Sequence, residues 1–248
     1  MSKKIASGTD ALVIDVKTGA GAFMKTLDQS RTLAQALVKI GKQVGLQCMA
    51  VISDMNQPLG NKIGNSLEIE ESIDVLKGKG PVDLTDLVLT LGSYMVVMGG
   101  KAKTAKEARQ LLEQTIADSS ALERFKAMVI AQGGDPLVME DYSIMPQAKY
   151  RIAYQAKRAG VITKLSADEI GTASMLLGGG RQKADDQLDY SVGIELHHKL
   201  GDQVEAGDTL LTIYSNRQEV ADIEKLLDDS IQISDHGEKP TLIHEIIE

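Results

Sequence analysis

The chain has 248 residues, of which 43% are hydrophobic and 25% charged, and this composition excludes wholesale disorder. The formal net charge is −8 and no dense run of Lys and Arg occurs, which argues against DNA or RNA as the main partner. The first residues lack the apolar core of a signal peptide, and no apolar run reaches membrane-spanning length. We therefore expect a cytoplasmic protein with neither a nucleic acid nor a membrane as partner. The single cysteine, Cys48, excludes an internal disulfide, and we expect it to pack in a core.

Residues 1–8 have the composition of a helix end without a helix beginning. Lys3 and Lys4 lie near the end of this segment, Gly8 is suited to terminate it, and no capping residue precedes the first turn. Two interpretations remain open. Either the element is a frayed start, or the natural chain extends upstream.

The stretch Ala11–Phe23 organises the first half of the chain. Its apolar, β-branched beginning predicts a buried strand, and small residues then form a loop around Gly19 and Gly21. Thr26 and Gln29 form a capping box that predicts the start of a helix. Strand, glycine loop and helix in this order are typical of the ligand-binding edge of an α/β sheet. A plain turn remains the alternative, because neither the third glycine of a dinucleotide fingerprint nor a Walker lysine is present.

A second strand is predicted over 47–53, which completes a β-α-β unit. Its exit, the polar loop 54–64, belongs to the same sheet edge as the glycine loop. Glu71 follows about one turn into the next helix, where a carboxylate can join loop carbonyls around a hard cation. Spacing alone favours an ordinary surface role for Glu71 and for Lys3.

Helices then follow one another to residue 131. Capping patterns predict helices that start at Asn65, at Asp83 and at Thr104, the second running to Met98 and the third to about Asp118. A further helix is predicted over 122–131. The pattern dissolves between 132 and 146, where we place a domain boundary.

The last third has the pattern of a small β-rich domain. Short strands are predicted over 150–155, 160–165, 192–196 and 209–214, followed by a final helix over 219–233. The tail 234–248 is either a docked strand or a loose end. Residues 199–210 have the turn-strand-turn pattern of lipoyl and biotinyl carrier domains, but the hairpin lysine that those carriers need is absent. His197 and His198 point to opposite faces of a strand, which argues against a zinc site.

Four long segments resemble the pyrimidine-nucleoside and thymidine phosphorylase family. They are MSKKIASGTDALVIDVKTGAGAFMKT, AVISDMNQPLGNKIGNSLEIEESIDVLKG, DEIGTASMLLGGGR and LDYSVGIELHHKLGDQVEAGDTLLTIYS, and they match in order across nearly the whole chain. The resemblance implies a homodimeric glycosyltransferase for which inorganic phosphate is the co-substrate and no organic cofactor is needed. Phosphate attacks C1′ of uridine or thymidine and yields the free base and (deoxy)ribose 1-phosphate. Whether one or both nucleosides are used stays open.

The resemblance also implies roles for individual residues. Lys3 is similar to the lysine that bonds the pyrimidine ring and stabilises the leaving base, and Phe23 to the residue that packs on the base. Leu59 and Lys62, through their carbonyls, and Glu71, through its carboxylate, resemble the ligands of a structural potassium ion. Position 62 is commonly small in the family, and a carbonyl ligand tolerates the lysine found here.

Family members carry roughly another domain before Met1, including most of a small α-domain and the phosphate-binding groups. We therefore expect Met1 to be an internal methionine of a longer enzyme and the isolated chain to be inactive. The expected fold class is α/β, with a mixed or mostly parallel sheet flanked by helices and a small β-rich, barrel-sandwich-like domain after it. The predicted ranges are 1–9 for the remnant of an α-domain helix, 10–132 for the central α/β domain, 147–233 for the C-terminal domain and 234–248 for the tail. The alternative function is a non-catalytic binding or assembly subunit that needs a separate N-terminal chain.

Overall fold

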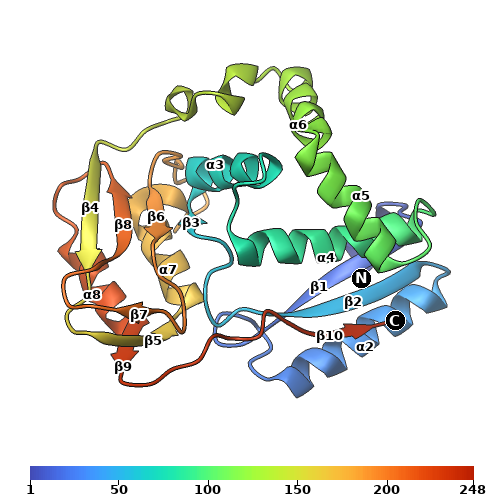
Figure 1. Cartoon of the computed structure of the whole chain (residues 1–248), viewed down its shortest axis with the longest axis horizontal. Helices are drawn as coiled ribbons and strands as arrows, with labels where there is room; N and C mark the ends of the chain where they lie inside the picture. The colour runs from blue at the N-terminus through green and yellow to red at the C-terminus, as the bar shows by residue number, and fades with distance from the viewer.

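The computed structural model describes residues 1–248 and shows an α/β domain and a β-rich domain side by side (Figure 1). The α-helices are α1 (Ser2–Ala6), α2 (Leu27–Gln43), α3 (Asn65–Leu76), α4 (Val82–Met98), α5 (Ala105–Ala117), α6 (Ser120–Ala131), α7 (Ala167–Ser174) and α8 (Ala221–Ser230). The strands are β1 (Ala11–Thr18), β2 (Gln47–Asp54), β3 (Lys62–Ile63), β4 (Tyr150–Gln155), β5 (Gly160–Leu165), β6 (Gly193–Leu196), β7 (Gln203–Val204), β8 (Thr209–Ser215), β9 (Ile231–Ser234) and β10 (Ile243–Ile247). Short helical turns lie at Pro136–Met139, Tyr142–Ile144 and Met175–Gly179. The expected fold class is confirmed.

The first sheet has the order β1-β2-β10 and holds the first domain together. β1 and β2 are parallel, with Ala11 opposite Gln47 and Thr18 opposite Asp54, so both strands end at the same edge. α2 packs on one face of this sheet, and α4 lies on the other face (Figure 1). The core beneath α2 includes Cys48, which is buried as expected, and burial raises the pKa of its thiol.

The start of α2 follows the predicted capping box. The Thr26 hydroxyl accepts the backbone N–H of Gln29, and the Gln29 side chain accepts the N–H of Thr26. The prediction of a cap at Asn65 is wrong. Gly64 occupies the N-cap position of α3, because the Asn65 amide donates instead to the carbonyl of Gly179, at 2.8 Å.

α4 crosses the middle of the molecule, and α5 and α6 then rise to the top, where the chain passes to the second domain (Figure 1). α4 ends at Met98 as expected, but Pro81 is its N-cap, and Asp83 lies in the first turn. The Asp83 carboxylate accepts the N–H groups of Leu84 and of Gly60, 23 residues earlier. Thr104 caps α5 as predicted, since its hydroxyl accepts the N–H of Glu107.

The second domain consists of two small antiparallel sheets around the largest core of the molecule. The sheet orders are β3-β6-β8-β4 and β7-β5-β9, and the core contains 17 buried residues. β3 leaves the first domain to pair with β6, with Ile63 opposite Ile194. The 199–210 segment supplies the tight turn and the short strand β7 of this domain.

The last part of the chain returns to the first domain. The predicted final helix over 219–233 is too long at both ends, because α8 spans Ala221–Ser230 and the next residues form β9, with Ile233 opposite Ile162. The tail is a docked strand, since β10 pairs antiparallel with β2. The domain ranges stay a prediction, and the structure adds that β3 and β10 each pair with a sheet of the other domain.

Candidate functional site

The glycine loop after β1 is tied to the loop after β2 by its own backbone. The N–H of Gly19 donates to the carbonyl of Met24 at 3.2 Å, that of Ala20 to the Asn56 amide oxygen at 2.9 Å, and that of Gly21 to the carbonyl of Met55 at 2.9 Å. Gly19 has a φ of +117°, and a Cβ there would lie 2.7 Å from the Asn56 side chain. The glycines thus permit a close approach between two loops, and the three N–H groups bind the chain itself rather than a phosphate.

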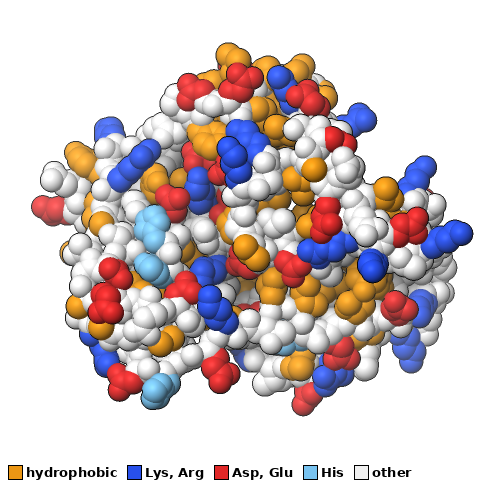
Figure 2. Space-filling view, in the orientation of Figure 1, with side chains coloured by type: hydrophobic (Ala, Val, Ile, Leu, Met, Phe, Trp, Pro, Cys, Tyr) orange, Lys and Arg blue, Asp and Glu red, His pale blue; other side chains and the backbone are white.

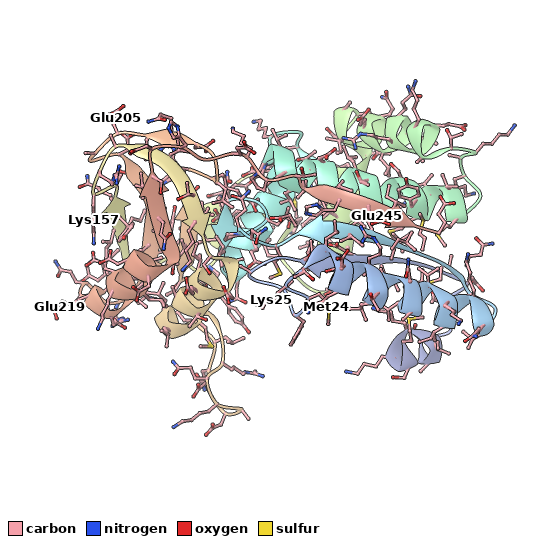
Figure 3. All side chains as sticks on the ribbon, turned by 90° about the horizontal axis from the view of Figure 1, so that it is seen from below. Met24, Lys25, Lys157, Glu205, Glu219 and Glu245 are labelled. Atoms are coloured by element: carbon pink, nitrogen blue, oxygen red, sulfur yellow. The ribbon has the colours of Figure 1, made fainter.

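This closed loop presents Phe23 to solvent. Phe23 is 99% exposed, although the loop around it is held by several hydrogen bonds and by Lys25, whose ammonium donates to the carbonyl of Ala20. The next two residues, Met24 and Lys25, lie at the end of the first domain that faces the second domain (Figure 3). An exposed aromatic ring on an ordered loop is a preformed contact for a flat ligand.

Lys3 lies far from Phe23. It belongs to α1, which contains no buried residue, and neighbouring Met1 packs on the core near Gly41, at the end where β2 begins. Phe23 follows the opposite end of β1. Eight strand residues separate the two sites, a length of roughly 23 Å at the usual rise per residue. The structure does not bring Lys3 and Phe23 together, and their shared role stays a prediction.

The three predicted cation ligands do lie together. Leu59, Lys62 and Glu71 line one cavity of about 360 Å³ at the exit of β2. The Glu71 carboxylate accepts the backbone N–H groups of Asn61 at 2.7 Å and Lys62 at 3.1 Å, so it fastens the loop to α3. Gly60 is in contact with the same carboxylate, because a Cβ on it would lie 2.2 Å from Glu71 Oε2.

Burial raises the pKa of Glu71, and the two N–H bonds and the nearby ammonium groups of Lys199 and Lys62 oppose that shift. No group of three or more His, Cys, Asp or Glu side chains stands ready to hold a metal ion. The donors predicted from the resemblance are one carboxylate and two carbonyls, an all-oxygen set of the kind that suits a hard cation such as potassium. One Glu71 oxygen, Oε1, accepts both of these N–H groups.

A second polar cluster at the same edge was missed from the sequence. The ammonium of Lys17 lies 2.5 Å from the Asp15 carboxylate and 2.9 Å from the Ser53 hydroxyl, which also donates to Asp15. Lys17 lines the 360 Å³ cavity together with Glu71. The alternation of β1 was a usable signal, because residues 15 and 17 of one strand share a face.

A larger cleft of about 1120 Å³ lies between the domains. Its walls come from the loop after β2, from α3, α4 and α5, from the turn after β6 and from the segment before β10. They carry Lys62, Lys79, Arg109, Lys199 and Lys239 beside Glu71, Asp74, Asp83, Asp86, Glu113, Glu195 and Asp202. Figure 2 shows positive and negative side chains intermingled around the middle of the molecule. A lining with charged side chains of both signs suits a polar ligand better than an apolar one.

No helix of the structure has both the length and the apolar character needed to cross a membrane.

Comparison with known families gives matches to two family models. The model described as "Glycosyl transferase family, a/b domain" matches residues 1–122, and the model described as "Pyrimidine nucleoside phosphorylase C-terminal domain" matches residues 161–234. Curated proteins named pyrimidine-nucleoside phosphorylase from Staphylococcus aureus strains USA300 and NCTC 8325 are each 58% identical over 247 residues. The match covers 100% of this chain and 57% of each relative, so the chain spans little more than half their length.

Proposed function

Since the chain belongs to the pyrimidine-nucleoside phosphorylase family, we propose that it serves the phosphorolysis of pyrimidine nucleosides, with inorganic phosphate as co-substrate. One observation carries this proposal: the match to the relatives, 58% identical over 247 residues, takes in both domains and the two loops at the sheet edge. The rival assignment, a non-catalytic assembly subunit, is not favoured by relatives that are named as phosphorylases.

The proposed reaction exchanges one bond at the sugar for another. A phosphate oxygen attacks C1′ of uridine or thymidine as the C1′–N1 bond breaks, the electron pair of that bond passes to the base, and the anionic base then takes a proton. Phe23 packs on the base in this proposal, which its exposed ring permits. The ammonium of Lys3 stabilises the negative charge that develops on the ring.

One pyrimidine ring cannot touch both side chains in the arrangement described above. The proposal therefore includes a movement of α1, which is short, has no buried residue and is followed by Gly8 with a φ of +70°. Such a movement would carry Lys3 towards the far end of β1. A Lys3→Ala variant that binds uracil as tightly as the unchanged chain contradicts this part of the proposal.

We also propose a structural potassium ion held by the carbonyls of Leu59 and Lys62 and by the Glu71 carboxylate. Their common cavity and all-oxygen chemistry support it. The expected result is a rise in melting temperature when potassium replaces tetramethylammonium at constant ionic strength, and its absence in Glu71→Gln. A homodimeric state and a cytoplasmic location complete the proposal.

The decisive experiment measures uracil release from uridine in phosphate buffer. The chain is assayed alone and together with the part of a Staphylococcus aureus relative that the match leaves uncovered. We expect uracil and ribose 1-phosphate in equal amounts from the mixture, and none when phosphate is omitted. Uracil with free ribose instead would indicate a hydrolase, and no release from a folded mixture would favour the assembly role.

A further inference from the structure

Lys199 places a positive charge inside the loop that joins β2 to β3. It follows β6 in the second domain, and its side chain is only 19% exposed. Its ammonium donates to the carbonyls of Pro58 and Gly60, both at 2.5 Å, and lies 3.0 Å from Asp83 Oδ2. An ammonium group has three hydrogens, so these three oxygens satisfy it completely.

Further hydrogen bonds hold the backbone around Lys199 and the carboxylate that it reaches. On one side, the N–H of Lys199 donates to Asp202 at 2.9 Å, and the N–H of Leu200 donates to the Gln57 amide oxygen at 2.8 Å. On the other, the same Asp83 oxygen also accepts the N–H of Gly60, at 3.2 Å. The Asp83 carboxylate is thus placed by α4, whereas the two carbonyls belong to the loop that the lysine side chain binds.

Two carbonyls and one carboxylate are the donors that proteins offer to a bound alkali or ammonium cation. We infer that Pro58 O, Gly60 O and the Asp83 carboxylate form a monovalent-cation site that Lys199 closes with its own ammonium group. The ligand class is a monovalent cation of about the size of ammonium. This oxygen set shares no atom with the Leu59, Lys62 and Glu71 set, and the inference does not depend on the proposed function.

A tethered cation ties three parts of the molecule together. The amine comes from the second domain, the carbonyls come from the loop between the domains, and the carboxylate comes from α4 of the first domain. Lys199 is therefore a positioning residue. It holds the segment 58–60 in the conformation in which the next two N–H groups reach Glu71.

The test is chemical rescue of a truncated side chain. Lys199→Ala removes the ammonium and opens a passage from the 1120 Å³ cleft, which Lys199 lines, to the three oxygens. We expect the melting temperature in tetramethylammonium chloride to fall by about 5 °C. Potassium, ammonium or ethylammonium chloride at equal ionic strength should restore at least half of that loss, with a larger gain than the unchanged chain shows.

Two controls keep the test decisive. Lys199→Met fills the passage with an apolar side chain, so ethylammonium should not restore the melting temperature of this variant. Lys239→Ala removes an ammonium that is 75% exposed and pairs only with Asp202, so its response to the salts should equal that of the unchanged chain. If Lys199→Ala does not fold in tetramethylammonium chloride, circular dichroism after refolding in each salt gives the readout.

The inference is overturned if no small cation stabilises Lys199→Ala beyond the unchanged chain. It is also overturned if Lys199→Met responds to ethylammonium as strongly as Lys199→Ala does. Every measurement in this test reports the stability of the chain, not its activity. A failed phosphorylase assay therefore does not bear on the cation site, and a failed rescue does not bear on the proposed activity.

Discussion

At the scale of single residues, the exposed side chain of Phe23 is the one best placed to contact a ligand. Burying a phenylalanine side chain contributes about 1.5–3 kcal/mol, yet this ring is 99% exposed on a loop held by hydrogen bonds. Because the ring is not buried, it contributes little to the free energy of folding. The proposed contact with the pyrimidine base would account for its place at the sheet edge.

Phe23→Ala should therefore leave the free energy of unfolding within about 0.5 kcal/mol of the original value. Binding of uridine should weaken by about tenfold, since a stacked base is worth roughly 1–3 kcal/mol. Urea unfolding and calorimetric titration measure the two quantities. Tyr190→Ala is the matched control, an aromatic that is 53% exposed and lies outside the site. Equal weakening in both variants would show that Phe23 has no specific role.

Three tyrosines make the fold sensitive to alkali. Tyr142, Tyr154 and Tyr214 donate their hydroxyls to Asp74, Asp228 and Glu195 at 2.6, 2.5 and 2.6 Å. Burial is the main cause that raises the pKa of each phenol, and the carboxylate beside it adds to the shift. The folded chain thus keeps protons that the unfolded chain loses above about pH 10, and stability must fall as the pH rises further.

Tyr154→Phe should flatten this fall by up to about 1.4 kcal/mol per pH unit between about pH 10 and 11. The measurement is a series of urea unfolding curves over that range, with Tyr190→Phe as the control. An unchanged slope would show that the Tyr154 phenol ionises equally in both states.

At the scale of elements, sequence patterns predicted helix starts and strands correctly where the bonds involved lie within a short segment. The capping box at Thr26, the cap at Thr104 and the pattern of β1 and β2 are properties of short segments, and the structure confirms them. The cap at Asn65 failed because its amide bonds to Gly179, 114 residues away. No local rule predicts that partner.

The pairing of β3 and β10 with sheets of the other domain was equally beyond local reasoning. β3 has two residues and no periodicity, and the sequence left β10 open between a strand and a loose end. The same holds for the site. Family resemblance singled out Leu59, Lys62 and Glu71, whereas Lys199 and Asp83 became visible only when distant segments met in space.

β10 protects the edge of β2, because its pairing and the bond from Asp54 N–H to the Leu242 carbonyl, at 2.8 Å, occupy that edge. Deletion of residues 241–248 should therefore speed amide hydrogen exchange across 50–54 at least tenfold and leave β6 and β8 unchanged. Mass spectrometry of exchanged peptides gives both values.

Glu245→Ala serves as the control for that deletion. It removes the ion pair with Arg31 at 2.7 Å but keeps the strand, so exchange in β2 should change little. Unchanged protection of 50–54 after the deletion would mean that β10 contributes nothing to the sheet.

At the scale of the whole molecule, the candidate site lies where the two domains are joined. The loop after β2 and the segment before β10 both cross between the domains, and they are joined by the bond from Asp54 N–H to the Leu242 carbonyl, while Lys199 binds the loop and Asp83 of α4 (Figure 1). A substrate at the sheet edge would thus contact segments whose geometry depends on both domains.

The central claim is that the exits of β1 and β2 form the pyrimidine-binding side of the site. Nuclear magnetic resonance of the isotope-labelled chain, titrated with uridine, tests it most directly. We predict that the largest amide shifts fall in residues 19–25 and 54–62. Shifts confined to α5 and α6, with both loops unchanged at saturating uridine, would contradict the account.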